Sequence, residues 1–148
     1  MTLFVSTETI LSFPPPVAFA CWTQRDQIKR WWGENGVYHV IAWVSDLRPG
    51  GSWRALFEAP DGSHFGAGGD YGKVLDPHCL EWTWCPDWHS GQVLKLVMTF
   101  SQLGKGTRFA FSCDGFRTEA ERDEGERRWH QIIGWLDRSQ ADAELRQK

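Results

Sequence analysis

Four residues near the middle of the chain are of types that bind transition metals: His78, Cys79, Cys85 and His89. Structural zinc sites usually take their cysteines in pairs two to four residues apart. Cys79 and Cys85 instead fall at the two ends of one predicted strand, about 20 Å apart at roughly 3.3 Å per residue. We therefore predict no metal site, and we assign no cofactor.

Acid–base catalysis would need a histidine or a carboxyl group beside a nucleophile. The sequence contains no Gly-x-Ser-x-Gly nucleophile elbow. His39 on a predicted strand and His130 on the predicted last helix could each exchange a proton near neutral pH. Histidines with satisfied hydrogen bonds at or near the surface explain both residues more simply, so we assign no catalytic residue.

Aromatic side chains are the most abundant candidates for binding, with ten Trp, nine Phe and two Tyr. Each buries roughly 150–250 Å². Inward-facing pairs recur along the predicted strands: Trp53/Phe57, Phe65/Tyr71, Trp82/Trp84, Met98/Phe100 and Phe109/Phe111. Such rings either fill a close-packed core or line a concave apolar space, the usual form of a small-molecule site. The ligand-binding residues predicted from this region are Trp32, Trp53, Phe57, Tyr71, Trp82, Trp84, Met98, Phe100 and Phe111.

The predicted last helix adds four candidates. Helical spacing of 100° per residue places Ile133 beside Trp129, with Gly125 and Arg122 on the same inward stripe. A glycine inside a helix costs roughly 0.5–1 kcal/mol relative to alanine. We predict that Gly125 leaves room beside Trp129 for a ligand and that Arg122 anchors the ligand at the mouth. The alternative is a frayed first turn with Arg122 in solvent.

Composition limits the class of protein. A chain of 148 residues matches one domain, here 1–148, and needs no disulfide or metal to stabilise it. A net charge of −3 and a pI of about 5.9 argue against nucleic-acid binding. The sequence has neither an apolar run long enough to span a membrane nor a signal peptide. The four scattered cysteines are typical of reduced thiols, so we expect a cytoplasmic protein.

The order of elements predicts an α+β fold. Six strands with short turns follow the helical region and form an antiparallel meander, which must bury its apolar face against the one long helix. We expect a helix-grip architecture, with a curved antiparallel sheet of about seven strands wrapped around that helix and two short helices after strand one. The predicted strands are 2–11, 37–46, 52–59, 64–75, 80–85, 92–102 and 107–113, and the predicted helices are 16–31, as one helix or two, and 117–147.

Turn residues support this arrangement. Pro60-Asp61-Gly62 is a strong hairpin signal. Asp46 and Arg48 alternate just before Pro49-Gly50-Gly51, so their side chains share a face and are expected to form a salt bridge that fixes the tight turn. Four glycines in 64–75 predict a bulge or sharp bend of the sheet.

An ordered set of motifs resembles a known family. The motifs are Trp31-Trp32, Asp46-x-Arg48-Pro49-Gly50-Gly51-x-Trp53, Pro60-Asp61-Gly62, Gly69-x-Tyr71, Val74-x-x-Pro77-x-x-Leu80-x-x-Thr83-Trp84, Gly106-Thr107-Arg108, Gly115-Phe116 and Trp129. From about Phe4 to Leu136 the chain resembles the activator of heat-shock-protein-90 ATPase homologue-like proteins. These belong to the START-like, birch-pollen-allergen-like superfamily (SRPBCC).

The resemblance implies the helix-grip fold and a cavity between sheet and long helix, where relatives hold lipids, steroids or polyketides. It implies no single activity, because the superfamily includes carriers, cyclases and hydrolases. Chaperone activation belongs to eukaryotic relatives with an additional N-terminal domain, so we do not expect it here.

Three functions remain open at this stage. The first is a non-catalytic protein that binds a small apolar or aromatic molecule beside Trp129, faced by Trp53, Tyr71 and Trp84. The second is a cyclase- or hydrolase-type enzyme that uses the same cavity. The third is an accessory protein that acts through protein–protein contact, and a homodimer is compatible with all three.

Overall fold

The computed structural model describes residues 3–147, with side chains as far as residue 139, so the predicted strand residue Thr2 lies outside the described part. The elements, in chain order, are β1 Leu3–Leu11, α1 Pro15–Thr23, α2 Arg25–Trp31, β2 Gly33–Glu34, β3 Tyr38–Ser45, β4 Ser52–Glu58, β5 His64–Leu75, β6 Cys79–Pro86, β7 Leu94–Leu103, β8 Gly106–Phe116 and α3 Glu119–Gln147. The predicted order is confirmed, with two short helices after the first strand. The added element is β2, whose two residues pair with the start of β3.

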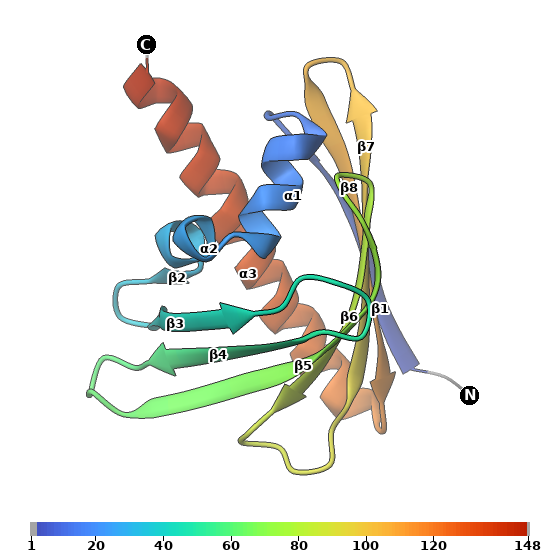
Figure 1. The fold of residues 1–148 in the computed structure, drawn as a ribbon. Helices are drawn as coiled ribbons and strands as arrows, with labels where there is room; N and C mark the ends of the chain where they lie inside the picture. The colour runs from blue at the N-terminus through green and yellow to red at the C-terminus, as the bar shows by residue number, and fades with distance from the viewer. Residues whose placement is uncertain (1–2, 148) are drawn as a thin grey trace.

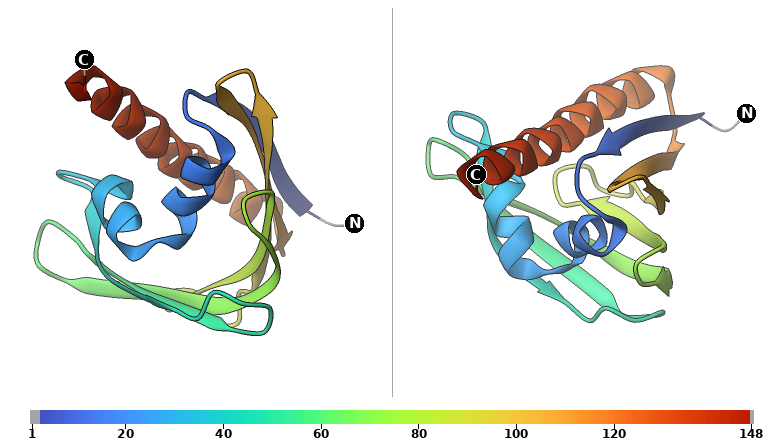
Figure 2. Two further views of the ribbon diagram at one scale, coloured as in Figure 1. Left: turned by 45° about the horizontal axis from the view of Figure 1, so that its top comes forward. Right: turned by 90° about the horizontal axis from the view of Figure 1, so that it is seen from above.

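The strands form one antiparallel sheet in the order β1-β8-β7-β6-β5-β4-β3-β2. The sheet curls strongly, so that β3 and β4 run nearly across the direction of β7 and β8 (Figure 1). Helix α3 lies across the concave side, with α1 and α2 next to it (Figure 2). This is the predicted α+β helix-grip architecture.

The bend passes through β5, as its glycines predict. The β5–β6 pairing shifts register between Tyr71 and Val74. A Cβ on Gly69 would collide with the backbone carbonyl of Thr83 on β6, so only glycine allows the two strands to approach this closely. The resulting curve brings β4 and β5 over the helix.

Aromatic rings fill the space between sheet and helix. Strand β6 alternates between buried and half-buried positions, which turns Trp82 and Trp84 inward. Trp84 stacks on Trp32 of the α2 end at 5.9 Å between ring centroids and meets Trp129 of α3 edge-on at 5.1 Å. Ile133 on the same stripe of α3 is also buried. The rings of the sheet, of the α2 end and of α3 are therefore in contact with one another through Trp84.

The structure tests two local predictions, the Asp46–Arg48 salt bridge and the start of the last helix. The Asp46–Arg48 salt bridge is present, with 2.7 Å between Arg48 Nε and Asp46 Oδ2. The last helix begins at Glu119 rather than at 117, because the Thr118 hydroxyl caps it by accepting from the Glu121 backbone N–H at 3.1 Å.

Candidate functional site

A cavity of about 330 Å³ lies where the curled sheet meets α3, and its wall is almost entirely aromatic. We call it the aromatic groove, and it is lined by Tyr38, Phe57, Phe65, Trp84, Trp88 and Arg128. These residues come from β3, β4, β5, β6, the loop after β6 and α3. Five separate segments of the sheet side therefore meet one helix at this point.

Ring contacts fix the shape of the groove. Phe65 stacks on Phe57 with ring centroids 5.2 Å apart and meets Tyr38 edge-on at 5.4 Å. Trp88 meets Phe65 edge-on at 5.4 Å and keeps 42% of its surface exposed. A large exposed indole beside buried rings offers a stacking surface for a planar apolar ligand.

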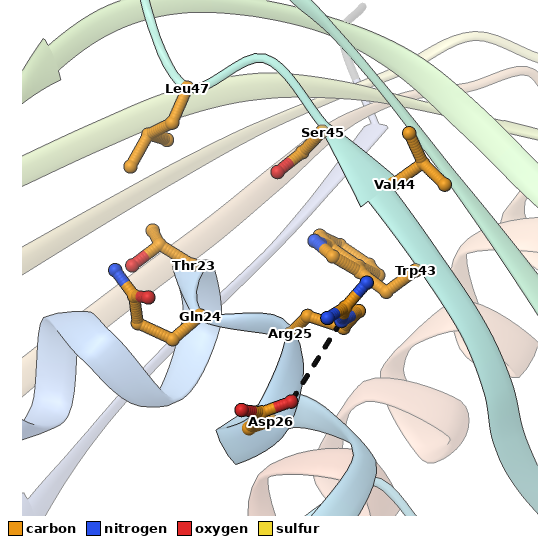
Figure 3. A pocket seen from close by; sticks show the side chains of 8 residues that line it. All are labelled: Thr23, Gln24, Arg25, Asp26, Trp43, Val44, Ser45 and Leu47. Carbon is orange, nitrogen blue, oxygen red and sulfur yellow. Dashed lines mark ion pairs between the residues drawn. The ribbon is translucent and has the colours of Figure 1, made fainter.

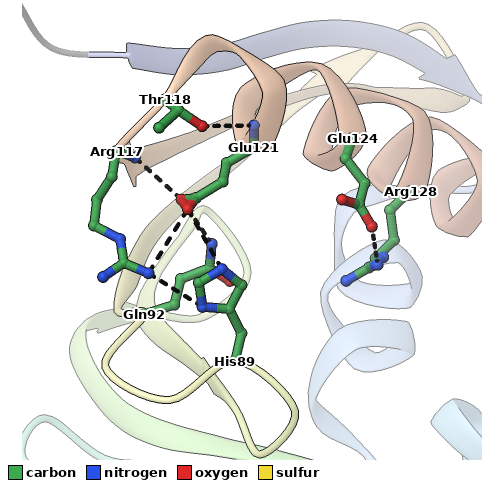
Figure 4. Close-up of polar contacts among 7 residues, drawn as sticks. All are labelled: His89, Gln92, Arg117, Thr118, Glu121, Glu124 and Arg128. Atoms are coloured by element: carbon green, nitrogen blue, oxygen red, sulfur yellow. Dashed lines mark hydrogen bonds and ion pairs between the residues drawn. The ribbon is translucent and has the colours of Figure 1, made fainter.

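Arg128 provides the positive charge in the wall of the groove. Its guanidinium carbon lies 5.4 Å from the centre of the Trp88 ring, a cation–π contact. Its Nη2 donates to Glu124 Oε1 at 2.8 Å, one turn earlier on α3 (Figure 4). Because a guanidinium has five N–H donors, Arg128 can bind a ligand oxygen while it keeps this ion pair.

A narrower cavity of about 100 Å³, the side cavity, shares Trp84, Trp88 and Arg128 with the groove. It continues between the loop after β6 and the first turns of α3. Its remaining walls are formed by His89, Gln92, Leu94, Phe116, Glu121, Glu124, Gly125 and Trp129. The two cavities together surround Trp88 and Arg128.

Glu121 joins this loop to the start of α3. Its carboxylate accepts from the Arg117 backbone N–H at 3.2 Å and lies 3.4 Å from His89 Nε2 (Figure 4). Nη2 of Arg117 also lies 3.2 Å from His89 Nδ1. The Arg117 N–H first, and then the nearby positive charges, hold the pKa of Glu121 below its usual range. Both ring nitrogens of His89 are thus engaged in holding the loop on the helix.

Tyr38 contributes a neutral hydroxyl. Burial raises the pKa of Tyr38, although the indole N–H of Trp32, which donates to its oxygen at 3.3 Å, and the charge of Arg128 oppose the shift. The phenol therefore keeps its proton at physiological pH.

The predicted site residues other than Arg122 divide into two groups. Phe57, Trp84, Gly125 and Trp129 line the groove or the side cavity. The remaining aromatic and aliphatic candidates are at most 6% exposed and pack in the interior, namely Trp32, Trp53, Tyr71, Trp82, Met98, Phe100, Phe111 and Ile133. For this second group the structure agrees with the close-packed core that the sequence left open.

Gly125 was predicted to leave room for a ligand beside Trp129, but the structure gives this glycine a different role. A Cβ on Gly125 would come within 2.5 Å of Cε1 of the Phe116 ring. The space beside Gly125 is therefore filled by the side chain of Phe116, which is itself only 7% exposed.

Arg122 does not point to the groove. Its Nε donates to the Phe4 carbonyl at 3.0 Å, and its Nη2 lies 2.6 Å from Glu126 Oε2. It ties α3 to the edge strand β1 and so differs from both the predicted anchor and the solvent-exposed alternative. The charged group of the groove is Arg128, six residues later.

Tyr38, Trp88 and Arg128 were not predicted. Trp88 lies in a loop, where no periodicity assigns a face, and Arg128 stands 100° from Trp129 on the helix wheel. Tyr38 shares a face of β3 with buried Val40 while His39 between them is exposed, and that pattern could have revealed it.

Possible metal ligands do not gather in the described part of the chain, where no group of three His, Cys, Asp or Glu side chains could hold an ion. Cys79 begins β6 and Cys85 lies near its end, as the strand prediction required. Cys79, Cys85 and Cys113 are free thiols.

A curled antiparallel sheet that grips one long helix, with cavities where the two meet, defines a helix-grip protein. The chain belongs to the family described as "Activator of Hsp90 ATPase homolog 1-like protein", which it matches over residues 12–139. This family is part of the SRPBCC superfamily, whose fold typically binds hydrophobic ligands.

Solved structures agree on the fold. An AHSA1-like protein from Aeromonas hydrophila is 22% identical, with a TM-score of 0.80 over 96% of this chain and 94% of that one. A protein from Nitrosomonas europaea is 22% identical, with a TM-score of 0.79 over 95% and 96%. CalU16 from Micromonospora echinospora is 19% identical, with a TM-score of 0.71 over 98% and 80%. None of the curated proteins compared with the chain matches it.

Membrane insertion through a helix has no support in residues 3–147, since none of their helices is both long and apolar enough to cross a bilayer.

Proposed function

We propose that this protein binds a small aromatic molecule with an acidic group in the aromatic groove. The observation that carries the proposal is a cavity of about 330 Å³ with five aromatic residues and one arginine in its wall. This volume lies within the range of about 300–1,000 Å³ typical of small-molecule sites.

The ring arrangement favours a planar ligand. Phe65 and Trp88 present faces and edges to the same space, so a flat apolar group can stack on one ring and meet the other edge-on. Burial of that group would supply most of the affinity, at roughly 25 cal/mol per Å² of apolar surface removed from water.

Arg128 favours an anionic end on the ligand. A carboxylate can accept two parallel N–H bonds from a guanidinium, which fixes its orientation as well as its charge. Hydrogen bonds to charged groups contribute about 1.5–3 kcal/mol. Arg128 is about one third exposed, so the lower end of that range applies, equivalent to roughly tenfold in affinity.

The polar groups around the cavities favour binding over reaction. His89 is held by Glu121 and Arg117, and Tyr38 keeps its proton, so each of these groups is either engaged or neutral. A non-catalytic binder is therefore the function that this geometry supports best.

The test uses 1-naphthoate and its neutral amide, 1-naphthamide, as probes, with binding measured by calorimetry. Arg128→Gln should weaken 1-naphthoate binding about tenfold and change 1-naphthamide binding much less. Arg127→Gln is the matched control, because Arg127 is exposed on the same helix and outside the groove lining. Equal losses in both variants, or no saturable binding of either probe, would contradict the proposal.

A further inference from the structure

A second hollow, of about 450 Å³, lies at the opposite end of β3 from the aromatic groove. We call it the polar pocket, and it is lined by Thr23, Gln24, Arg25, Asp26, Trp43, Val44, Ser45 and Leu47 (Figure 3). It separates the α1–α2 junction from the end of β3. Ser45 stands seven residues after Tyr38 of the groove, about 23 Å along the strand at 3.3 Å per residue.

Trp43 places a buried, unsatisfied hydrogen-bond donor in the wall of this pocket. The side chain is 2% exposed, and its Nε1 has no hydrogen-bond partner in the described part of the chain. In Figure 3 the indole nitrogen points into the space between Ser45 and Gln24. Buried polar atoms are almost always bonded to protein, ordered water or a ligand, so this donor calls for an acceptor inside the pocket.

Three more unsatisfied polar atoms lie in the core behind Trp43. They are Nε1 of Trp22, Nε1 of Trp82 and the hydroxyl of Tyr71. The rings of Trp22, Trp43 and Tyr71 each contact Trp82, at 6.3–6.4 Å between centroids. Every buried unsatisfied side-chain atom found among the described residues therefore belongs to one neighbourhood.

Ser45 connects this neighbourhood to the pocket. Burial raises the pKa of Tyr71 to about 12, and the Ser45 side chain partly opposes the shift, although the two hydroxyls do not reach hydrogen-bond geometry. Because Ser45 lines the pocket, the neutral Tyr71 hydroxyl lies directly behind its wall. Trp43 is therefore the buried donor in the lining itself, and the Tyr71 hydroxyl lies behind Ser45.

The outer rim adds further donors. The Gln24 amide and the Arg25 guanidinium face the same opening. Asp26, the acidic residue of the lining, lies 3.8 Å from Arg25 Nε in an exposed ion pair. The Thr23 hydroxyl is already used, because it donates to the Phe19 carbonyl at 2.9 Å. The Gln24 amide, the Arg25 guanidinium and the Trp43 indole therefore supply N–H donors to the opening, beside the Asp26 carboxylate.

We propose that the polar pocket is a second binding site, for a small molecule that presents a carboxylate oxygen to the indole N–H of Trp43 with Arg25 at the rim. An acceptor at this point satisfies a buried donor, and a negative charge suits the arginine. The site is separate from the aromatic groove, and it stands whether or not the groove binds an aromatic acid.

Nuclear magnetic resonance of the ¹⁵N-labelled protein tests this site directly, because each indole N–H gives its own signal. Trp43→Phe identifies the Trp43 signal and removes the donor while keeping a ring. Sodium acetate is the probe, acetamide is the neutral comparison, and sodium chloride at equal ionic strength is the control.

We expect acetate to shift the Trp43 indole signal saturably, at a concentration at least fivefold below that needed for acetamide. Arg25→Gln should reduce this difference, and it leaves Trp43 in place as the reporter. The remaining indole signals report whether each variant stays folded.

Two results would overturn the proposal. One is a Trp43 signal that acetate moves no more than sodium chloride does. The other is a Trp43 indole that keeps an unchanged water cross-peak at the highest acetate concentration, which would mean that the pocket holds water only. A parallel titration with the neutral 1-naphthamide separates the two sites, because the groove predicts a response of Trp88 rather than of Trp43.

Discussion

Gly125→Ala tests the packing of α3 against the end of β8. A methyl group at this position would come within 2.5 Å of Cε1 of Phe116. Overpacking of this kind typically costs about 1–3 kcal/mol. Alanine regains about 0.5–1 kcal/mol of helix propensity, so we expect a net loss of about 1 kcal/mol.

The same helix supplies a matched control. Gly134 has open space where its Cβ would lie, with nothing within 4 Å. Gly134→Ala should therefore gain about 0.5–1 kcal/mol through propensity alone. For a chain of this size 1 kcal/mol corresponds to about 2–4 °C in Tm, so the two substitutions should shift Tm in opposite directions.

Urea unfolding and calorimetry of the two variants, with and without Phe116→Ala, complete the test. Removal of the Phe116 ring should turn the loss from Gly125→Ala into a gain, since the obstacle is gone. If Gly125→Ala stabilises the protein as much as Gly134→Ala does while Phe116 is present, the steric explanation is refuted.

Two other predictions concern ionisation. Because the pKa of Glu121 is lowered in the folded protein, its stabilising contribution is full above the ordinary value near 4.5 and disappears as the pH falls through the folded value. Glu121→Gln should therefore destabilise the protein at pH 7. The difference in unfolding free energy between this variant and the parent should shrink as the pH is lowered. A difference that stays constant with pH would argue against the Arg117 and His89 contacts. Burial raises the pKa of Cys113 to about 12, so this thiol should resist iodoacetamide at pH 8 until the chain unfolds, as followed by peptide mass analysis, and rapid native-state alkylation would contradict its burial.

Much of the fold could be predicted because local signals agree with one another. Strand alternation placed Trp82 and Trp84 inward, and helical spacing placed Trp129 and Ile133 on the buried face of α3. The Asp46–Arg48 salt bridge was also predicted, although both residues lie in the loop after β3 rather than on the strand. The two-residue strand β2 was not predicted, because so short a strand shows no alternation of apolar and polar residues.

The site was harder to predict, since periodicity tells which side chains face inward but not which of them leave a space. Phe57 and Trp82 both alternate inward, yet Phe57 lines the groove and Trp82 is packed among other rings. Gly125 raised the same problem, because its empty Cβ position is filled by Phe116 from 9 residues earlier in the chain. Arg122 lies on the inward stripe of α3 yet bonds to β1, whereas Arg128, 100° from Trp129, reaches the groove, and helical spacing alone does not reveal either outcome.

We propose above that the aromatic groove holds a small aromatic acid. A crystal structure of the protein grown with saturating 1-naphthoate tests it most directly. We expect the naphthalene ring to lie against both Phe65 and Trp88, stacked on one and edge-on to the other, with the carboxylate at hydrogen-bond distance from Arg128. A naphthoate bound elsewhere, or a groove left empty at saturation, would contradict it.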